Sequence, residues 1–241
     1  DRVATSPKDA VRMAVMAGID MSMVPLDYSF CDLLLECVKD GSVPVARIDE
    51  AVSRILTVKY QLGLFDRPYP NLKLKEKFAS KEFTQANLDA ARECITMTKN
   101  ERKLLPLSKT AKVFVTGPTA ASLSAMNGGW TITWQGDREE LYPKNKSTIL
   151  QAIQEKIGAA SVTYLPGSTL NTPIDIPAAV EGAKKSDIAV VCLGEGAYCE
   201  TPGNIDNLTL DKAQRDLASA LFQTGKPVVV VLVEGRPRVL S

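Results

Sequence analysis

The stretch Asp187–Glu195, DIAVVCLGE, decides the fold of this chain. Its six apolar residues, Ile188 to Leu193, are rich in β-branched types and predict a buried strand. Glycines on both sides of Glu195 predict a tight turn directly after the strand. In a parallel α/β sheet, ligands gather at the loops that follow the carboxyl ends of strands. Glu195 is therefore either placed for chemistry or an ordinary surface glutamate of a strand-to-helix loop.

The chain around this stretch alternates between strand and helix patterns. Such alternation predicts a mostly parallel sheet with helices on both faces. The run Val228–Val233 has no polar alternation, which predicts a strand buried on both faces. The expected strands are 112–116, 161–165, 188–193 and 227–233, and the expected helices are 147–157, 176–185 and 210–223.

The first hundred residues have a different pattern. Apolar spacing predicts helices over 7–17, 30–39, 47–62 and 84–99, with a short strand over 19–24. Residues 71–85 are lysine-rich and weakly patterned, which is typical of a surface connection.

Composition excludes several classes of protein. The 241 residues include no histidine, so nucleophile activation by histidine is excluded and a zinc or non-haem iron site is not expected. Acid–base chemistry must then use carboxylates, Lys, Tyr or Cys. A net charge of +1 argues against a nucleic-acid or anionic-membrane partner. The five cysteines fit neither a metal motif nor a dense disulfide framework. We expect no cofactor.

The segment Asn127–Asp137, NGGWTITWQGD, holds both tryptophans of the chain. Indoles in a glycine-flanked loop suit the apolar faces of sugar rings, while Asp, Gln and Asn side chains bond the hydroxyls. This predicts a sugar platform at Trp130, whereas Trp134 taken alone is better explained as a core residue.

Six segments in order resemble family 3 glycoside hydrolases of the β-glucosidase type. Together they span nearly the whole chain, and their order carries more weight than any one of them. They are 17–21 (AGIDM), 47–56 (RIDEAVSRIL), 63–69 (GLFDRPY), 104–107 (LLPL), 128–136 (GGWTITWQG) and 194–195 (GE) with 225–227 (GKP) and 235–237 (GRP).

The resemblance implies the end of a (β/α)8-like barrel followed by an incomplete α/β/α sandwich. Residues 1–66 would belong to the barrel, 67–100 to a linker and helix, and 101–241 to the sandwich. In this family a barrel Asp in a Ser-Asp-Trp motif is the nucleophile. The motif is missing here, and the resemblance places it shortly before Asp1, so we expect the isolated chain to be inactive.

The resemblance also implies roles for particular residues in a retaining mechanism, which needs two carboxyl groups about 5–5.5 Å apart. Glu195 is assigned the acid/base role, with Glu200 as its competitor in the same loop. Trp130, Glu200, Tyr198 and Asp20 are assigned to substrate binding, although capping or salt bridging explains Asp20 better.

We therefore expect hydrolysis of terminal β-D-glucosyl residues from β-glucosides or β-gluco-oligosaccharides. A β-xylosidase and a non-catalytic carbohydrate-binding module are the alternatives. The expected partners are the substrate and the rest of the parent polypeptide, and a homo-oligomer stays open. The resemblance favours a secreted or periplasmic location.

Overall fold

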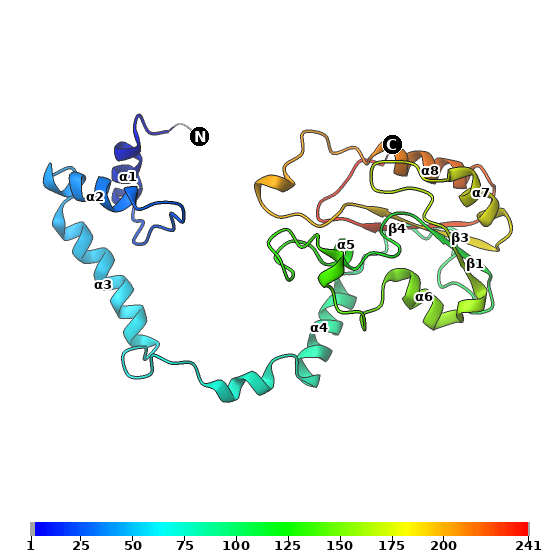
Figure 1. The fold of residues 1–241 in the computed structure, drawn as a ribbon, viewed down its shortest axis with the longest axis horizontal. Helices are drawn as coiled ribbons and strands as arrows, with labels where there is room; N and C mark the ends of the chain where they lie inside the picture. The colour runs from blue at the N-terminus through cyan, green and yellow to red at the C-terminus, as the bar shows by residue number, and fades with distance from the viewer. Residues whose placement is uncertain (1–2, 241) are drawn as a thin grey trace. The chain divides into compact units, whose positions relative to one another are not determined.

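The computed structural model describes residues 3–240. The chain divides into two compact units, one ending at Thr96 and the other beginning at Met97. Figure 1 shows the first unit in blue to cyan and the second in green to red. The division into barrel end, linker and sandwich stays a prediction.

The first unit is helical. Its elements are α1 (Pro7–Met16), α2 (Ser29–Lys39), α3 (Val45–Gln61), the 3-10 helix η1 (Leu72–Lys77) and α4 (Lys81–Cys94). The hydroxyl of Ser6 caps α1 by accepting a hydrogen bond from the Asp9 N–H, and the proline at position 7 suits the first helical position. A small core between α1 and α2 contains Val11, Val15, Cys37 and Val43.

The strand predicted over residues 19–24 does not form. These residues have no regular structure, and the Ile19 and Met21 side chains are exposed. A strand needs a neighbour to pair its backbone N–H and C=O groups, and the first unit has no other strand among its described residues. The predicted helix over 84–99 begins earlier and stops at Cys94.

The second unit contains a four-stranded parallel sheet in the order β2-β1-β3-β4. The strands are β1 (Val113–Thr116), β2 (Val162–Tyr164), β3 (Ile188–Gly194) and β4 (Val228–Val233). β3 lies between β1 and β4 and is buried along its whole length. This confirms the α/β class and the buried strand predicted over residues 188–193.

Helices cover both faces of this sheet (Figure 1). α7 (Ile176–Lys184) and α8 (Lys212–Phe222) pack on one face, and α6 (Ile149–Ile157) packs on the other. The remaining elements are α5 (Leu123–Asn127) and the 3-10 helices η2 (Glu139–Leu141), η3 (Ala159–Ser161) and η4 (Thr201–Gly203). None of them was predicted, because each is five residues or shorter.

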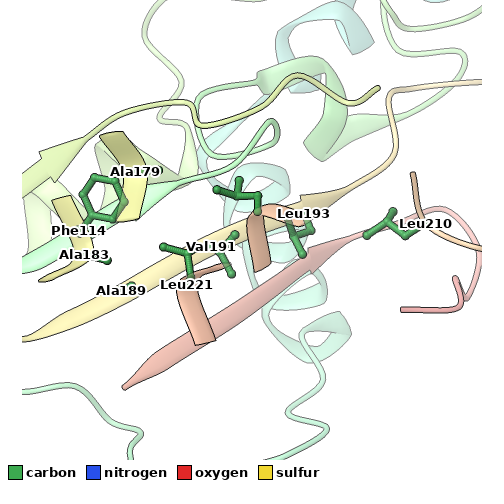
Figure 2. Close-up of a cluster of buried hydrophobic side chains, with 9 residues drawn as sticks. Phe114, Ala179, Ala183, Ala189, Val191, Leu193, Leu210 and Leu221 are labelled. Carbon is green, nitrogen blue, oxygen red and sulfur yellow. The ribbon is translucent and has the colours of Figure 1, made fainter. Parts of the chain in front are cut away.

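The core under α7 and α8 is built around the ring of Phe114 (Figure 2). Phe114 meets small residues of α7, since a Cβ added at Gly182 would clash with the ring, and Ala179 and Ala183 are fully buried. Leu217 and Leu221 of α8 are also fully buried.

β4 corrects one expectation. It was predicted to be buried on both faces, but Val230 is 36% and Leu232 is 40% exposed. By the alternation of a strand, Val230 and Leu232 lie on the same face as Val228, and of these three only Val228 packs against the core under α7 and α8, so this face of the edge strand is left partly uncovered. None of the helices within residues 3–240 combines the length and apolarity needed to span a bilayer.

Candidate active site

The turn after β3 is fixed by its backbone. Gly194 ends the strand with a φ of +147°, and a Cβ there would overlap the carbonyl of Val233 in β4. The next N–H, of Glu195, donates to that same carbonyl at 3.0 Å. The buried Gln214 side chain bonds both the N–H and the C=O of Gly194 at 2.9 Å. Glycine is therefore required at this position, and Glu195 is held at the carboxyl edge of the sheet.

Glu195 is 9% exposed and takes part in a buried ion pair. Its Oε1 accepts a hydrogen bond from Nη1 of Arg238 and lies 3.4 Å from Nε of Arg236. Arg238 also donates to the carbonyls of Leu208 and Thr209, both at 2.8 Å. The carboxylate thus acts as the counter-ion of two arginines that hold the following loop.

A cavity of about 460 Å³ lies beside this ion pair. Oε2 of Glu195 is buried there and makes no hydrogen bond within residues 3–240. Its lining combines apolar residues with the polar side chains of Asn171, Glu195, Tyr198, Gln214, Arg236 and Arg238.

A second buried carboxyl group lies at the end of β4. Oε1 of Glu234 is buried without a hydrogen-bond partner in the described part of the chain. Burial, together with the nearby negative charge of Glu195, raises the pKa of Glu234 above its ordinary value. Sequence reasoning missed Glu234, because it follows an apolar run without any local motif.

Tyr198 is held by Arg236. The guanidinium carbon lies 3.9 Å from the centre of the phenol ring, and Nε donates to the phenol oxygen at 2.7 Å. The ring also packs closely on Gly203 and Gly235. Within this unit Tyr198 therefore packs the loop together, and its predicted role in substrate binding stays a prediction.

Glu200 differs from Glu195 in almost every respect. It is exposed, its side chain does not cap η4, and it has no ion-pair partner among residues 3–240. Its backbone lies at φ +54° and ψ −146°, a region that non-glycine residues rarely occupy. Its carbonyl accepts a hydrogen bond from the Gly203 N–H at 2.8 Å. The loop thus presents a carboxylate that no side chain within residues 3–240 neutralises.

The loop 128–136 presents the tryptophans. Trp130 is 69% exposed and lies at φ +61°, and its N–H donates to the Trp134 carbonyl at 2.8 Å. Ile132 also has a positive φ, +66°. Trp134 is 47% exposed, so the expectation that it lies in the core is wrong. The tight loop turns both indoles outward, which sequence spacing does not reveal.

Backbone strain gathers in these two loops. Five non-glycine residues among those described have a positive φ, and three of them are Trp130, Ile132 and Glu200. Each such conformation costs about 1–3 kcal/mol and persists where the surrounding structure enforces it, often at functional sites.

Gln135 joins the two loops. Its side-chain Nε2 donates to the Cys199 carbonyl at 3.1 Å, and its Oε1 accepts from the Cys199 N–H at 3.0 Å. Gly129 lies against the same segment, where a Cβ would be 2.5 Å from the Cys199 Cβ. The sequence suggested Gln135 as a sugar ligand, yet its amide is used by the protein backbone.

Asp20 lies in the first unit. It accepts hydrogen bonds from Nη2 of Arg47 at 2.7 Å and Nη1 of Arg54 at 3.2 Å. The bond from Arg47, together with the charge of Arg54, lowers the pKa of Asp20. This is the salt-bridging role given as the alternative, and the role in substrate binding stays a prediction.

The described residues hold no candidate metal site. Within residues 3–240 no group of three or more His, Cys, Asp or Glu side chains is arranged to hold an ion.

Comparison with known proteins gives a consistent picture. Residues 95–241 match the Glycosyl hydrolase family 3 C-terminal domain, and residues 2–58 match the Glycosyl hydrolase family 3 N terminal domain. The lysosomal beta glucosidase of Dictyostelium discoideum is 41% identical over 98% of this chain and 30% of its own length. A beta-xylosidase of Formosa agariphila is 31% identical over 98% of this chain and 34% of its own length.

Among solved structures, the β-glucosidase from Listeria innocua in complex with glucose has a TM-score of 0.82 at 28% identity. The match covers 98% of this chain and 31% of that protein. The chain thus spans about a third of the length of the relatives it matches.

Proposed function

Because this chain belongs to glycosyl hydrolase family 3, we propose that it forms part of a retaining β-glucosidase. The enzyme would remove terminal non-reducing β-D-glucosyl residues from β-glucosides or β-gluco-oligosaccharides. The observation that carries the proposal is an exposed, unpaired carboxylate, Glu200, in a loop that Gln135 joins to the loop of the exposed Trp130. The nucleophile would come from residues outside this chain.

The two loop glutamates suit different roles. A general acid must carry a proton when substrate binds and must reach the leaving oxygen. Glu195 is the counter-ion of Arg238, whose side chain is only 13% exposed, and neutralising Glu195 would leave that guanidinium unpaired, which is costly. Glu200 pairs with no cation among residues 3–240, and its side chain is exposed to solvent. We therefore assign the acid/base role to Glu200 and a structural role to Glu195, which reverses the preference drawn from the sequence.

Trp130 would bind the sugar of the leaving group. Its indole is 69% exposed, and the apolar face of a pyranose stacks on such a ring. Its strained backbone fixes the direction in which the indole points.

The test is Glu200→Ala in the complete enzyme. Hydrolysis of cellobiose, whose leaving group needs a proton, should fall by about 10³-fold. Cleavage of 2,4-dinitrophenyl β-glucoside needs no acid and should form the glycosyl-enzyme at nearly the wild-type rate. Azide should then speed turnover and give β-glucosyl azide, since it attacks the intermediate without a general base.

Glu195→Ala is the matched comparison, because it removes a carboxylate five residues away in the same loop. We expect losses of similar size on both substrates and no rescue by azide. The opposite pattern, with rescue in Glu195→Ala and none in Glu200→Ala, would return the acid/base role to Glu195.

The β-xylosidase among the relatives makes xyloside hydrolysis the second candidate. A xylosidase excludes the hydroxymethyl group that distinguishes glucose from xylose. The ratio of kcat/KM for the aryl β-glucoside and the aryl β-xyloside decides between them. Micromolar binding of cellobiose by the complete protein without any turnover would instead favour the carbohydrate-binding module.

A further inference from the structure

We propose that Gln135 is a positioning residue that sets the conformation of Glu200 and fixes it relative to Trp130. This inference rests on the proposed function, because it gives Gln135 a part in the same acid–base step. The sugar-contacting surface would then belong to Trp130 and Glu200, with Gln135 behind them.

The side chain of Gln135 contacts the backbone of Cys199 through two hydrogen bonds. A single carboxamide meets both backbone groups of Cys199, the donor at 3.0 Å and the acceptor at 3.1 Å. The side chain thus pairs with Cys199 as a neighbouring strand would, across a sequence separation of 64 residues. Two bonds to one residue fix its orientation as well as its distance.

The orientation of Cys199 controls the backbone conformation of Glu200. The Cys199 carbonyl belongs to the peptide plane that precedes Glu200, and rotation of that plane sets the φ of Glu200. The plane that follows Glu200 is held by the hydrogen bond from the Gly203 N–H, at 2.8 Å. Both planes beside Glu200 are therefore fixed, which explains how a glutamate persists at φ +54°.

The loop that carries Trp130 contacts the segment that contains Cys199. Gly129 precedes Trp130 and touches the same segment, because a Cβ there would lie 2.6 Å from the Tyr198 carbonyl. The loop is closed by the bond from the Trp130 N–H to the Trp134 carbonyl, directly before Gln135. One side chain thus determines the spacing between the indole and the carboxylate.

Such spacing matters for proton transfer. A general acid must lie within hydrogen-bond reach of the leaving oxygen, and a displacement of about 1 Å can cost about 10²-fold in rate. A leaving group that needs no proton is insensitive to this displacement. A residue that positions the acid therefore has a signature that a residue needed only for folding lacks.

The experiment uses Gln135→Ala and Gln135→Glu in the complete enzyme. Gln135→Glu keeps the size and the acceptor but turns a carboxylate oxygen toward the Cys199 carbonyl, so it separates hydrogen bonding from packing. For both variants kcat on cellobiose should fall by about 10²-fold, whereas formation of the glycosyl-enzyme from 2,4-dinitrophenyl β-glucoside should fall less than about 3-fold. Gln223→Ala, an exposed glutamine at the end of α8, is the control and should match wild type.

The outcomes separate the two proposals. If Glu200→Ala shows the leaving-group dependence and azide rescue but both Gln135 variants match wild type, the positioning role is overturned and the proposed function stands. Equal losses on both substrates in Gln135→Ala and Gln135→Glu would also overturn it, in favour of a purely structural role. If Glu200→Ala itself shows neither effect, the assignment of the acid fails, and the positioning role fails with it.

Discussion

Replacing Glu195 by glutamine removes one buried negative charge while keeping the volume of the side chain. Arg238, whose side chain is 13% exposed, then loses its counter-ion. Removing one partner of a buried ion pair costs about 3–5 kcal/mol. The new amide oxygen still accepts a hydrogen bond, and Arg238 keeps its bonds to the Leu208 and Thr209 carbonyls. We therefore expect the lower limit, a loss of about 3 kcal/mol in the free energy of unfolding.

The partner variant Arg238→Met keeps the aliphatic stem and removes the guanidinium. It leaves Glu195 with Arg236 alone, at 3.4 Å, and should also cost about 3 kcal/mol. In the double variant no charge of the pair is left unpaired. Its loss should be smaller than the sum of the two single losses by about 2 kcal/mol, which is the coupling energy of a contacting pair.

Urea unfolding of the complete enzyme, followed by tryptophan fluorescence, measures these differences, provided that the variants share one slope. Hydrolysis of cellobiose and of the dinitrophenyl glucoside is measured on the same preparations below the transition. Additive losses would refute the ion pair as the reason for the burial of Glu195. An unchanged stability combined with azide rescue of Glu195→Ala would refute the whole division of roles between Glu195 and Glu200.

Two further predictions concern other buried groups. Glu234→Gln should stabilise the protein at neutral pH. The pKa of Glu234 is raised in the folded state, so the ionised carboxylate destabilises the fold at any pH above that folded-state pKa. This destabilisation disappears as the pH falls toward the pKa of the unfolded state, about 4.3. Urea midpoints of wild type and variant at pH 7 and pH 4 test this, and an equal difference at both would contradict it. Cys192 is fully buried, and burial raises the pKa of its thiol to about 12, so iodoacetamide at pH 8 should modify it only after unfolding. Peptide mass mapping identifies the modified residue, and rapid labelling of Cys192 in the native state would show that β3 is less buried than described.

The strands and the longer helices α6, α7 and α8 of the second unit could be predicted because each depends on local pattern. The apolar run Ile188–Leu193 reads as a buried strand in any surroundings, and the helical spacing around Leu217 and Leu221 fixes the face that α8 buries. The predictions that were wrong concern segments whose structure depends on neighbouring strands or helices. Residues 19–24 lack a strand to pair with among the described residues of their unit, and β4 is half-exposed because one of its faces is only partly covered by α7 and α8.

The candidate site likewise has features that local sequence patterns predict and features that depend on residues distant in sequence. The sequence alone limited acid–base chemistry to carboxylates, Lys, Tyr or Cys, because it contains no histidine. It also showed that two glutamates follow the predicted strand 188–193 within one short segment, and that Trp130 lies in a glycine-flanked segment. By resemblance it assigned the acid/base role to Glu195 with Glu200 as the competitor, but the surroundings that distinguish the two carboxylates come from partners distant in sequence. Arg238 lies 43 residues from Glu195, and Gln135 lies 64 residues from Cys199. Only the tertiary structure brings these groups together, and burial beside a cation commits one carboxylate to the fold while the other stays open to solvent.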